Sequence, residues 1–365
     1  MNNRNAIRTL YKNLLKPVLF RLDPEFVHNV FVGLGEALGQ RAAGRRLVER
    51  IYGYDGPDAA VILDGLRYET PVVLAAGFDY NGRLTGILKS VGFGGVEVGS
   101  VTARACPGNQ PPRLQRLPES QSLIVNKGLR NDGVEVVARR LRERWRPDGF
   151  VVGVSIARTN DEQSAGMEAG IEDYATSLRH LVETGVGDYY TINISCPNVH
   201  GGESFSVPDR LEPLLERLAE IRHARPMYAK MPINRNIDDF DGLLELLDRY
   251  GYNGVIIGNL NKDYDELEVP EEAPDEYQGG LSGAPTFDRS NELIRHTRDR
   301  YADRFTIIGC GGVMSAEDAL EKFRAGADLI QMISGMIFEG PHLMGEIAKT
   351  FAEQQASVTV LSARV

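Results

Sequence analysis

Short apolar runs alternate with amphipathic stretches over most of this chain. Beyond about Pro71, eight such runs have the length and continuous apolar character of strands that are buried on both faces. They lie at 72–76, 95–99, 151–156, 189–194, 226–231, 254–258, 306–309 and 329–333. Helical periodicity marks the segments between them, at 82–91, 133–145, 171–184, 207–223, 236–251, 287–301 and 315–325. Eight strand–helix units in succession predict an α/β protein with a (β/α)8 TIM barrel, rather than an open doubly wound sheet.

The first fifty residues follow a different pattern, which predicts an amphipathic helical region. Basic residues share one helical face before the first acidic residue, at Arg4, Arg8, Lys12, Lys16 and Arg21. Apolar residues recur on another face, at Ile7, Leu10, Leu14, Leu15, Val18 and Leu22. Pro17 interrupts helical hydrogen bonding, so we expect two short pieces. A second helix is expected from Asp23 and Pro24, which are typical of a helix start.

Two interpretations of this basic amphipathic region stay open. It suits the surface of an anionic membrane, and it equally suits a helix whose apolar face packs on its own domain. In either case we expect residues 1–50 to form an N-terminal helical extension and residues 51–365 to form the barrel. The acidic run 263–276 is expected to be a long loop after the sixth strand, either an active-site lid or a plain solvated loop.

Composition narrows the class of protein. A net charge of -10 argues against nucleic acid as the main partner, because phosphate binding needs a basic surface. The three cysteines, Cys106, Cys196 and Cys310, lie far apart and give neither a disulfide framework nor a metal-binding spacing. No apolar stretch approaches the ~20 residues of a membrane span. We therefore expect a cytoplasmic enzyme without a metal, with peripheral contact at the inner face of the cell membrane as an open alternative.

The end of the fourth predicted strand carries reactive and hydrogen-bonding groups. Asn193, Cys196 and Asn198 follow one another there, where a barrel places its active site. Paired carboxamides can hold a planar amide or carboxylate substrate, and a thiol can be tuned to remove a proton from carbon. The pattern predicts Cys196 as a catalytic base.

Glycine-rich segments near the last two predicted strands indicate a phosphate site. They contain Gly283, Gly311 and Gly312, and Ser334 ends the eighth strand. Barrels commonly bind phosphate with the loops that follow strands seven and eight. Lys230, at the end of the fifth strand, would place a positive charge at the barrel mouth, which suits the pyrimidine edge of a reduced flavin.

Ordered motifs over nearly the whole chain resemble the dihydroorotate dehydrogenase family, and most closely its membrane-associated, quinone-using class. They are LDPE at 22–25 with His28, LAAGFD at 74–79, VEVGSVT at 96–102, PGN at 107–109, PR at 112–113 and RLP at 116–118, together with the two late glycine motifs. The resemblance implies an FMN-dependent oxidoreductase that acts on a C–C bond beside a carbonyl, with dihydroorotate to orotate as the family reaction.

The resemblance also implies roles for individual residues. FMN would be held by Ala75, Ala76, Gly77, Ser100, Lys230, Gly283, Gly311, Gly312 and Ser334. Quinone would enter a tunnel formed by the N-terminal helices, with His28 and Arg116 at the head-group end. The substrate would lie against Asn193, Asn198, Asn259, Val125 and Lys127, with Cys196 as the base.

Several positions depart from the family pattern. Cys196 stands where the quinone-using class has Ser, and the soluble classes use Cys there. Tyr80 replaces a Lys, Val125 an Asn, Leu260 a Thr and Ser155 an Asn. Lys127 lies two residues beyond Val125 and would be placed to compensate. Three alternatives therefore stay open: a specialised homologue with a less polar substrate, a flavin-binding protein without turnover, and a barrel isomerase of phosphorylated sugars without flavin.

Overall fold

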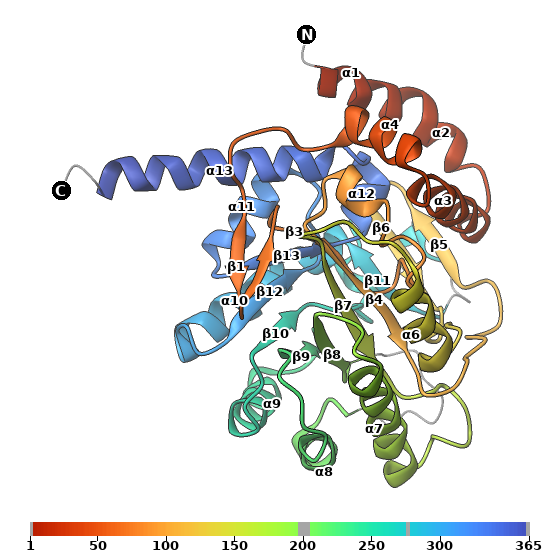
Figure 1. Ribbon diagram of the computed structural model, residues 1–365, viewed down its shortest axis with the longest axis vertical. Helices are drawn as coiled ribbons and strands as arrows, with labels where there is room; N and C mark the ends of the chain where they lie inside the picture. Colours follow the sequence, from red (N-terminus) through yellow and green to blue (C-terminus); the bar gives the residue numbers. More distant parts are fainter. Residues whose placement is uncertain (1–2, 196–204, 275–277, 363–365) are drawn as a thin grey trace.

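Eight parallel strands close into a barrel at the centre of the molecule (Figure 1). The computed structural model describes residues 3–195, 205–274 and 278–362. The barrel strands are β3 (Val72–Leu74), β4 (Gly95–Val101), β7 (Val151–Ile156), β8 (Tyr189–Asn193), β9 (Met227–Met231), β10 (Gly254–Ile257), β12 (Thr306–Cys310) and β13 (Leu329–Met332). These are the eight strands that the apolar runs predict, with small differences at their ends, and the (β/α)8 fold is confirmed.

Helices surround the barrel strands at most of the expected places. They are α5 (Leu88–Val91), α6 (Val134–Glu143), α7 (Met167–Thr184), α8 (Pro208–Ala219), α9 (Ile237–Arg249), α10 (Phe287–Tyr301), α11 (Ala316–Arg324), α12 (Ser334–Glu339) and α13 (Leu343–Ser362). The helix predicted at 82–91 is wrong over its first half. Gly82 has a φ of +67°, and the buried carboxylate of Asp79 accepts hydrogen bonds from the backbone N–H groups of Arg83 and Leu84, so this part is a turn.

A short hairpin closes the end of the barrel where the strands begin. β1 (Val61–Leu63) pairs with β2 (Leu66–Tyr68), and neither strand is among those that the sequence predicts. Tyr68 is fully buried there, beside Tyr189 and Tyr228. These aromatic rings fill the interior of the barrel at this end. A ligand site can therefore lie only at the opposite end, where the strands finish.

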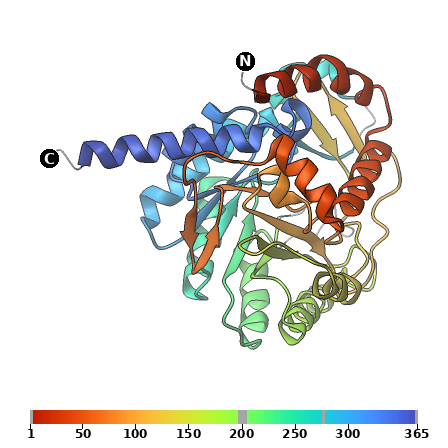
Figure 2. The same ribbon diagram turned by 45° about the horizontal axis from the view of Figure 1, so that its top comes forward.

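The N-terminal helices lie together beside the open end of the barrel, and α13 projects away on another side (Figures 1 and 2). They are α1 (Asn3–Leu10), α2 (Lys16–Leu19), α3 (Pro24–Gly39) and α4 (Ala42–Tyr52), with a π-helical turn at Tyr11–Leu15 between the first two. That turn is the interruption expected near Pro17. As predicted, Asp23 starts α3, because its carboxylate accepts a 2.7 Å hydrogen bond from the N–H of Phe26.

The first two helices turn their apolar face outward. Leu14 is 63% exposed and Val18 is 55% exposed. On another face, Arg8 and Lys12 form ion pairs with Glu339 of α12, although the Arg8 side chain is 45% exposed. The interpretation in which the apolar face packs on its own domain is therefore wrong for these residues. No helix of the described chain is both long and apolar enough to span a membrane.

A three-stranded antiparallel sheet covers part of the open end. It consists of β5 (Leu114–Leu117), β6 (Ser122–Val125) and β11 (Gly280–Gly283), in the order β11-β6-β5. The acidic segment after β10 packs against this sheet, with Leu267 buried in the same cluster as Ile124 and Leu281. The carboxylate of Glu272 accepts hydrogen bonds from the N–H groups of Glu119 and Ser120. The described part of 263–276 is thus a loop docked on the sheet through Leu267 and Glu272, while most of its other residues are exposed.

Candidate functional site

One cavity of about 330 Å³ lies between the open end of the barrel and the N-terminal helices. Its size falls within the range of about 300–1,000 Å³ that is usual for small-molecule sites. Each predicted site residue that the structure describes lines it: His28, Ala75, Ala76, Gly77, Ser100, Arg116, Val125, Lys127, Asn193, Lys230, Asn259, Gly283, Gly311, Gly312 and Ser334. Cys196 and Asn198 lie outside the described residues. The fold therefore brings the remaining candidates together, whatever role each one has.

A connected set of polar side chains forms the barrel side of the cavity. Asn193 donates a 2.9 Å hydrogen bond to the Ser100 hydroxyl, which lies 2.8 Å from the hydroxyl of Ser155. Asn259 donates a 2.6 Å hydrogen bond to the hydroxyl of Ser195. These bonds fix the orientation of both carboxamides before any ligand binds. Ser155 stands where the family has Asn, and its hydroxyl still gives Ser100 a hydrogen-bond partner.

Lys230 brings a positive charge to this polar floor. It lies on β9 directly opposite Asn193 of β8, and it is 5% exposed. Among the described residues, none forms a hydrogen bond or an ion pair with its ammonium group, although Glu97 is close enough for the Lys230 charge to oppose the burial that raises the pKa of that carboxyl. A nearly buried ammonium without a partner is costly, so this group is available to an electron-rich ligand.

The glycine-rich end of the cavity is formed by β11, β12 and the start of α12. The hydroxyls of Ser282 and Ser334 lie 2.9 Å apart. Gly312 has a φ of +72°, and a Cβ there would lie 2.4 Å from the Cβ of Phe287. Glycine is therefore required for the loop to pack against the start of α10. This packing leaves the loop backbone lining the cavity, as expected for an anion site.

The helical side of the cavity contains His28 and Arg116. His28 Nε2 lies 2.8 Å from the carbonyl oxygen of Phe78, and its ring stacks against Phe78 and Tyr80 with centroid distances of 4.9 Å and 5.3 Å. Burial lowers the pKa of His28, so the neutral ring donates from Nε2 to Phe78. Arg116 lies over the Phe20 ring and donates to the carbonyl oxygen of Leu22. His28 is held by Phe78 and Tyr80, which belong to the loop after β3, whereas Arg116 is held by the segment between α2 and α3.

A cluster of charges joins α3 to the barrel, and sequence reasoning did not find it. Glu25, in the first turn of α3, lies 3.2 Å from Arg113, 3.2 Å from Lys127 and 2.8 Å from Arg130. Among these cations Lys127 is the most buried, with 8% of its side chain exposed. In the sequence Glu25 is marked only as part of the LDPE motif, because its clustering with distant cations depends on the tertiary fold.

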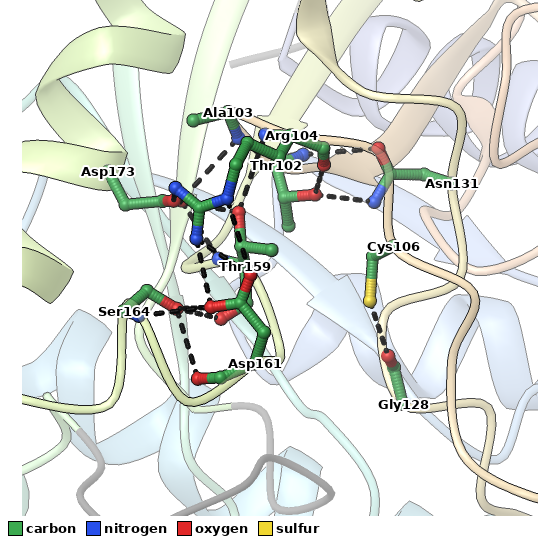
Figure 3. Close-up of polar contacts among 10 residues, drawn as sticks. All are labelled: Thr102, Ala103, Arg104, Cys106, Gly128, Asn131, Thr159, Asp161, Ser164 and Asp173. Carbon is green, nitrogen blue, oxygen red and sulfur yellow. Dashed lines mark hydrogen bonds and ion pairs between the residues drawn. The ribbon is translucent and has the colours of Figure 1, made fainter.

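Polar contacts brace the loop that carries Lys127 (Figure 3). Asn131 donates to the Thr102 hydroxyl and to the Leu129 carbonyl, and it accepts from the N–H of Gly133. The thiol of Cys106 donates to the carbonyl of Gly128. Nearby, Arg104 is bound by Asp161 and Asp173, and Asp173 also accepts two hydrogen bonds from Thr159. The loop is therefore fixed to the end of β4, next to Ser100.

Comparisons with known proteins agree with this geometry. Residues 59–354 match the family model described as dihydroorotate dehydrogenase. A dihydroorotate dehydrogenase (quinone) from Bordetella parapertussis is 37% identical over 93% of this chain and 97% of its own length, and one from Gloeobacter violaceus is 37% identical over 94% of each. A crystal structure of the enzyme from Eimeria tenella in complex with ferulenol covers 92% of both chains, with a TM-score of 0.80 at 23% identity, and it supports the fold.

Proposed function

The chain belongs to the dihydroorotate dehydrogenase family, and from this we propose that it binds FMN and oxidises dihydroorotate, or a closely related ring, with a quinone as electron acceptor. The observation that carries the proposal is the buried Lys230 ammonium, which has no hydrogen-bond or ion-pair partner among the described residues and lies beside the Ser100–Asn193 floor of the cavity.

The residues that line the cavity fit FMN. An anionic phosphate suits the glycine-rich end, and the electron-rich edge of a flavin suits Lys230. The residues that would hold the cofactor are Ala75, Ala76, Gly77, Ser100, Lys230, Gly283, Gly311, Gly312 and Ser334. When bound, FMN supplies the hydride acceptor. The chain itself supplies the positive charge of Lys230 and the oriented hydroxyl of Ser100.

The substrate is proposed to bind against Asn193 and Asn259, whose carboxamides are already oriented. Cys196 acts as the base that removes a proton from the carbon next to a carbonyl, and Asn198 completes the polar shell. Val125 and Leu260 give the cavity apolar surface near these groups. They favour, as a second candidate, a specialised homologue whose ring substrate is less polar than dihydroorotate.

The acceptor is proposed to enter between α1–α2 and α3, along the apolar part of the cavity. Leu19, Phe20, Val27 and Phe31 line this part, with His28 and Arg116 further in. The outward apolar face of α1 and α2 supports peripheral membrane contact, since it offers apolar side chains to the lipid that holds a quinone.

The test is an anaerobic stopped-flow measurement in which purified yellow protein is mixed with dihydroorotate. We expect the flavin absorbance to bleach, and we expect Cys196→Ala, which removes the proposed base, to slow bleaching by at least about a hundredfold near neutral pH while FMN stays bound. Unchanged bleaching kinetics in Cys196→Ala would show that Cys196 is not the base. A yellow wild-type protein that does not bleach would favour the specialised homologue, and a colourless protein that binds no added FMN would contradict the proposal as a whole.

A further inference from the structure

Lys127 occupies an unusual position for a charged side chain. The residue is 7% exposed, and its ammonium nitrogen forms no hydrogen bond with any described residue. It lies 3.2 Å from Glu25 as an ion pair and 5.8 Å from the centroid of the Tyr80 ring. An ammonium has three donors, and the ion pair with Glu25 engages at most one of them, so leaving the others unsatisfied in this buried site is costly. The cavity that Lys127 lines is the place where these donors can find an acceptor.

The neighbours of Lys127 place it on the side of the cavity that α3 forms. Glu25 and His28 both belong to α3, and Tyr80 is stacked on His28. By contrast, Asn193 and Asn259 are bound to Ser100 and Ser195 on the barrel side. Its position in the sequence, two residues beyond Val125, suggested a contact with the substrate. In the structure Lys127 lies instead on the side of the proposed acceptor entrance.

The arrangement of the charge cluster allows Lys127 to leave Glu25 and bind a ligand instead. One carboxylate, Glu25, serves three cations, and it keeps Arg113 and Arg130 if Lys127 moves to a ligand. Lys127 and Arg130 both approach the same oxygen, Oε1 of Glu25. The local excess of positive charge favours an anion in the adjacent cavity.

We propose that Lys127 binds the acceptor oxygen at the inner end of the entrance and stabilises the negative charge that develops there on reduction, with Glu25 as its exchangeable counter-ion. This inference rests on the proposed function, because it concerns the acceptor of that reaction. Reduction of a quinone gathers negative charge on its oxygens, and a preorganised cation in a water-poor cavity stabilises such charge strongly. The ligand class is an apolar quinone, bound more tightly when its head group carries a negative charge.

Binding to the FMN-loaded protein tests this without turnover. The probes are lawsone, a hydroxynaphthoquinone that is an anion at neutral pH, and menadione, its neutral methyl analogue. By calorimetry we expect the wild type to bind lawsone more tightly, and we expect Lys127→Met to weaken lawsone binding by about tenfold to a hundredfold while menadione binding changes little. Lys127→Arg keeps the charge and should keep most of the preference, which separates loss of charge from loss of folding.

Glu25→Gln tests the counter-ion. Because its neutral amide competes less for Lys127, lawsone should bind about threefold to tenfold more tightly. Glu36→Gln is the matched control: Glu36 also lies on α3 and also pairs with two arginines, Arg83 and Arg144, but its ion pairs do not include Lys127. If Glu25→Gln and Glu36→Gln weakened lawsone binding alike, Glu25 would be only a tether of α3 and the exchange would be refuted.

The two half-reactions separate this inference from the proposed function. We expect Lys127→Met to slow reoxidation of the reduced flavin by menadione about a hundredfold, while dihydroorotate bleaches it at the wild-type rate. Slower bleaching, or weaker orotate binding, with normal reoxidation would assign Lys127 to the substrate and overturn the inference. If menadione failed to reoxidise the wild type while lawsone still bound through Lys127, Lys127 would be an anion-binding residue. The assignment of a quinone as its ligand would then be refuted.

Discussion

At the scale of single residues, His342 shows how burial without hydrogen bonds changes the pKa of a side chain. It is 3% exposed, and neither ring nitrogen forms a hydrogen bond with a described residue. Its pKa is lowered from 6.5 to about 4, chiefly by burial and also by the charges of Arg8 and Lys12, which Glu339 opposes. Glu346 lies 3.9 Å from Nε2. The folded protein therefore favours the neutral ring.

This predicts a loss of stability in mild acid. Between pH 6.5 and about 4 the unfolded chain takes up a proton that the folded chain does not, so this contribution to the free energy of unfolding falls as the pH falls. Allowing for screening near the surface, we expect about 1–2 kcal/mol less stability at pH 4.5 than at pH 7 from this residue. Urea titrations of wild type and His342→Phe measure it, and parallel pH profiles for the two would refute it.

Individual site residues differ in whether the sequence could identify them. The sequence identified His28, Ser100, Asn193 and Lys230 as candidates because each lies in a motif at a strand or helix end, and each lines the cavity. The sequence could not show that Glu25 joins Lys127, because their contact depends on the packing of α3 against a loop about a hundred residues away.

At the scale of elements, the acidic loop after β10 is held by a small apolar cluster and by hydrogen bonds to the β5–β6 turn. Leu267 is 5% exposed and packs with Leu117, Ile124 and Leu281. The carboxylate of Glu272 accepts hydrogen bonds from the backbone of that turn, and the N–H of Val269 donates to the Ser120 hydroxyl. The prolines and acidic residues of the segment predict a loop, but docking through so few apolar side chains leaves no periodic signal.

We predict that Leu267→Ala loosens this loop without unfolding the barrel. Removing a buried Leu costs about 2–5 kcal/mol where the site cannot collapse, and here the cost falls on the docking of one loop. Limited proteolysis should cut within 263–274 at least about tenfold faster than in the wild type, with circular dichroism unchanged. Glu268→Ala is a control, because the Glu268 side chain is exposed. Equal cleavage rates for Leu267→Ala and wild type would show that Leu267 does not hold the loop.

At the scale of the whole molecule, charge and exposed apolar surface are distributed unequally. The chain has a net charge of -10, yet its first helices are basic and expose Leu10, Leu14, Val18, Phe26 and Leu34. These helices lie together on one side of the barrel (Figure 2). The proposed acceptor entrance and the apolar surface therefore lie on the same face of the molecule.

This predicts binding to lipid through that face. The double variant Leu14→Glu/Val18→Glu should reduce sedimentation with vesicles of anionic phospholipid by at least about tenfold, because it places charge where apolar side chains would enter the lipid. Ile62→Glu is the control, since Ile62 is 67% exposed but lies on the β1–β2 hairpin at the other end of the barrel. If the double variant and the control sedimented alike, the apolar face of α1 and α2 would not be the membrane contact.

The sequence by itself determined the eight barrel strands, most of the helices and the family, because buried parallel strands are continuous apolar runs and because ordered motifs mark the strand ends. Every site residue that it predicted, and that the structure describes, lines the cavity. Only the tertiary structure decided that the apolar face of α1 turns outward, that the β1–β2 hairpin closes the barrel, and that Glu25 gathers three cations around Lys127. Periodicity reports which face of an element is apolar, whereas the direction of that face and long-range charge pairs depend on how the elements pack together.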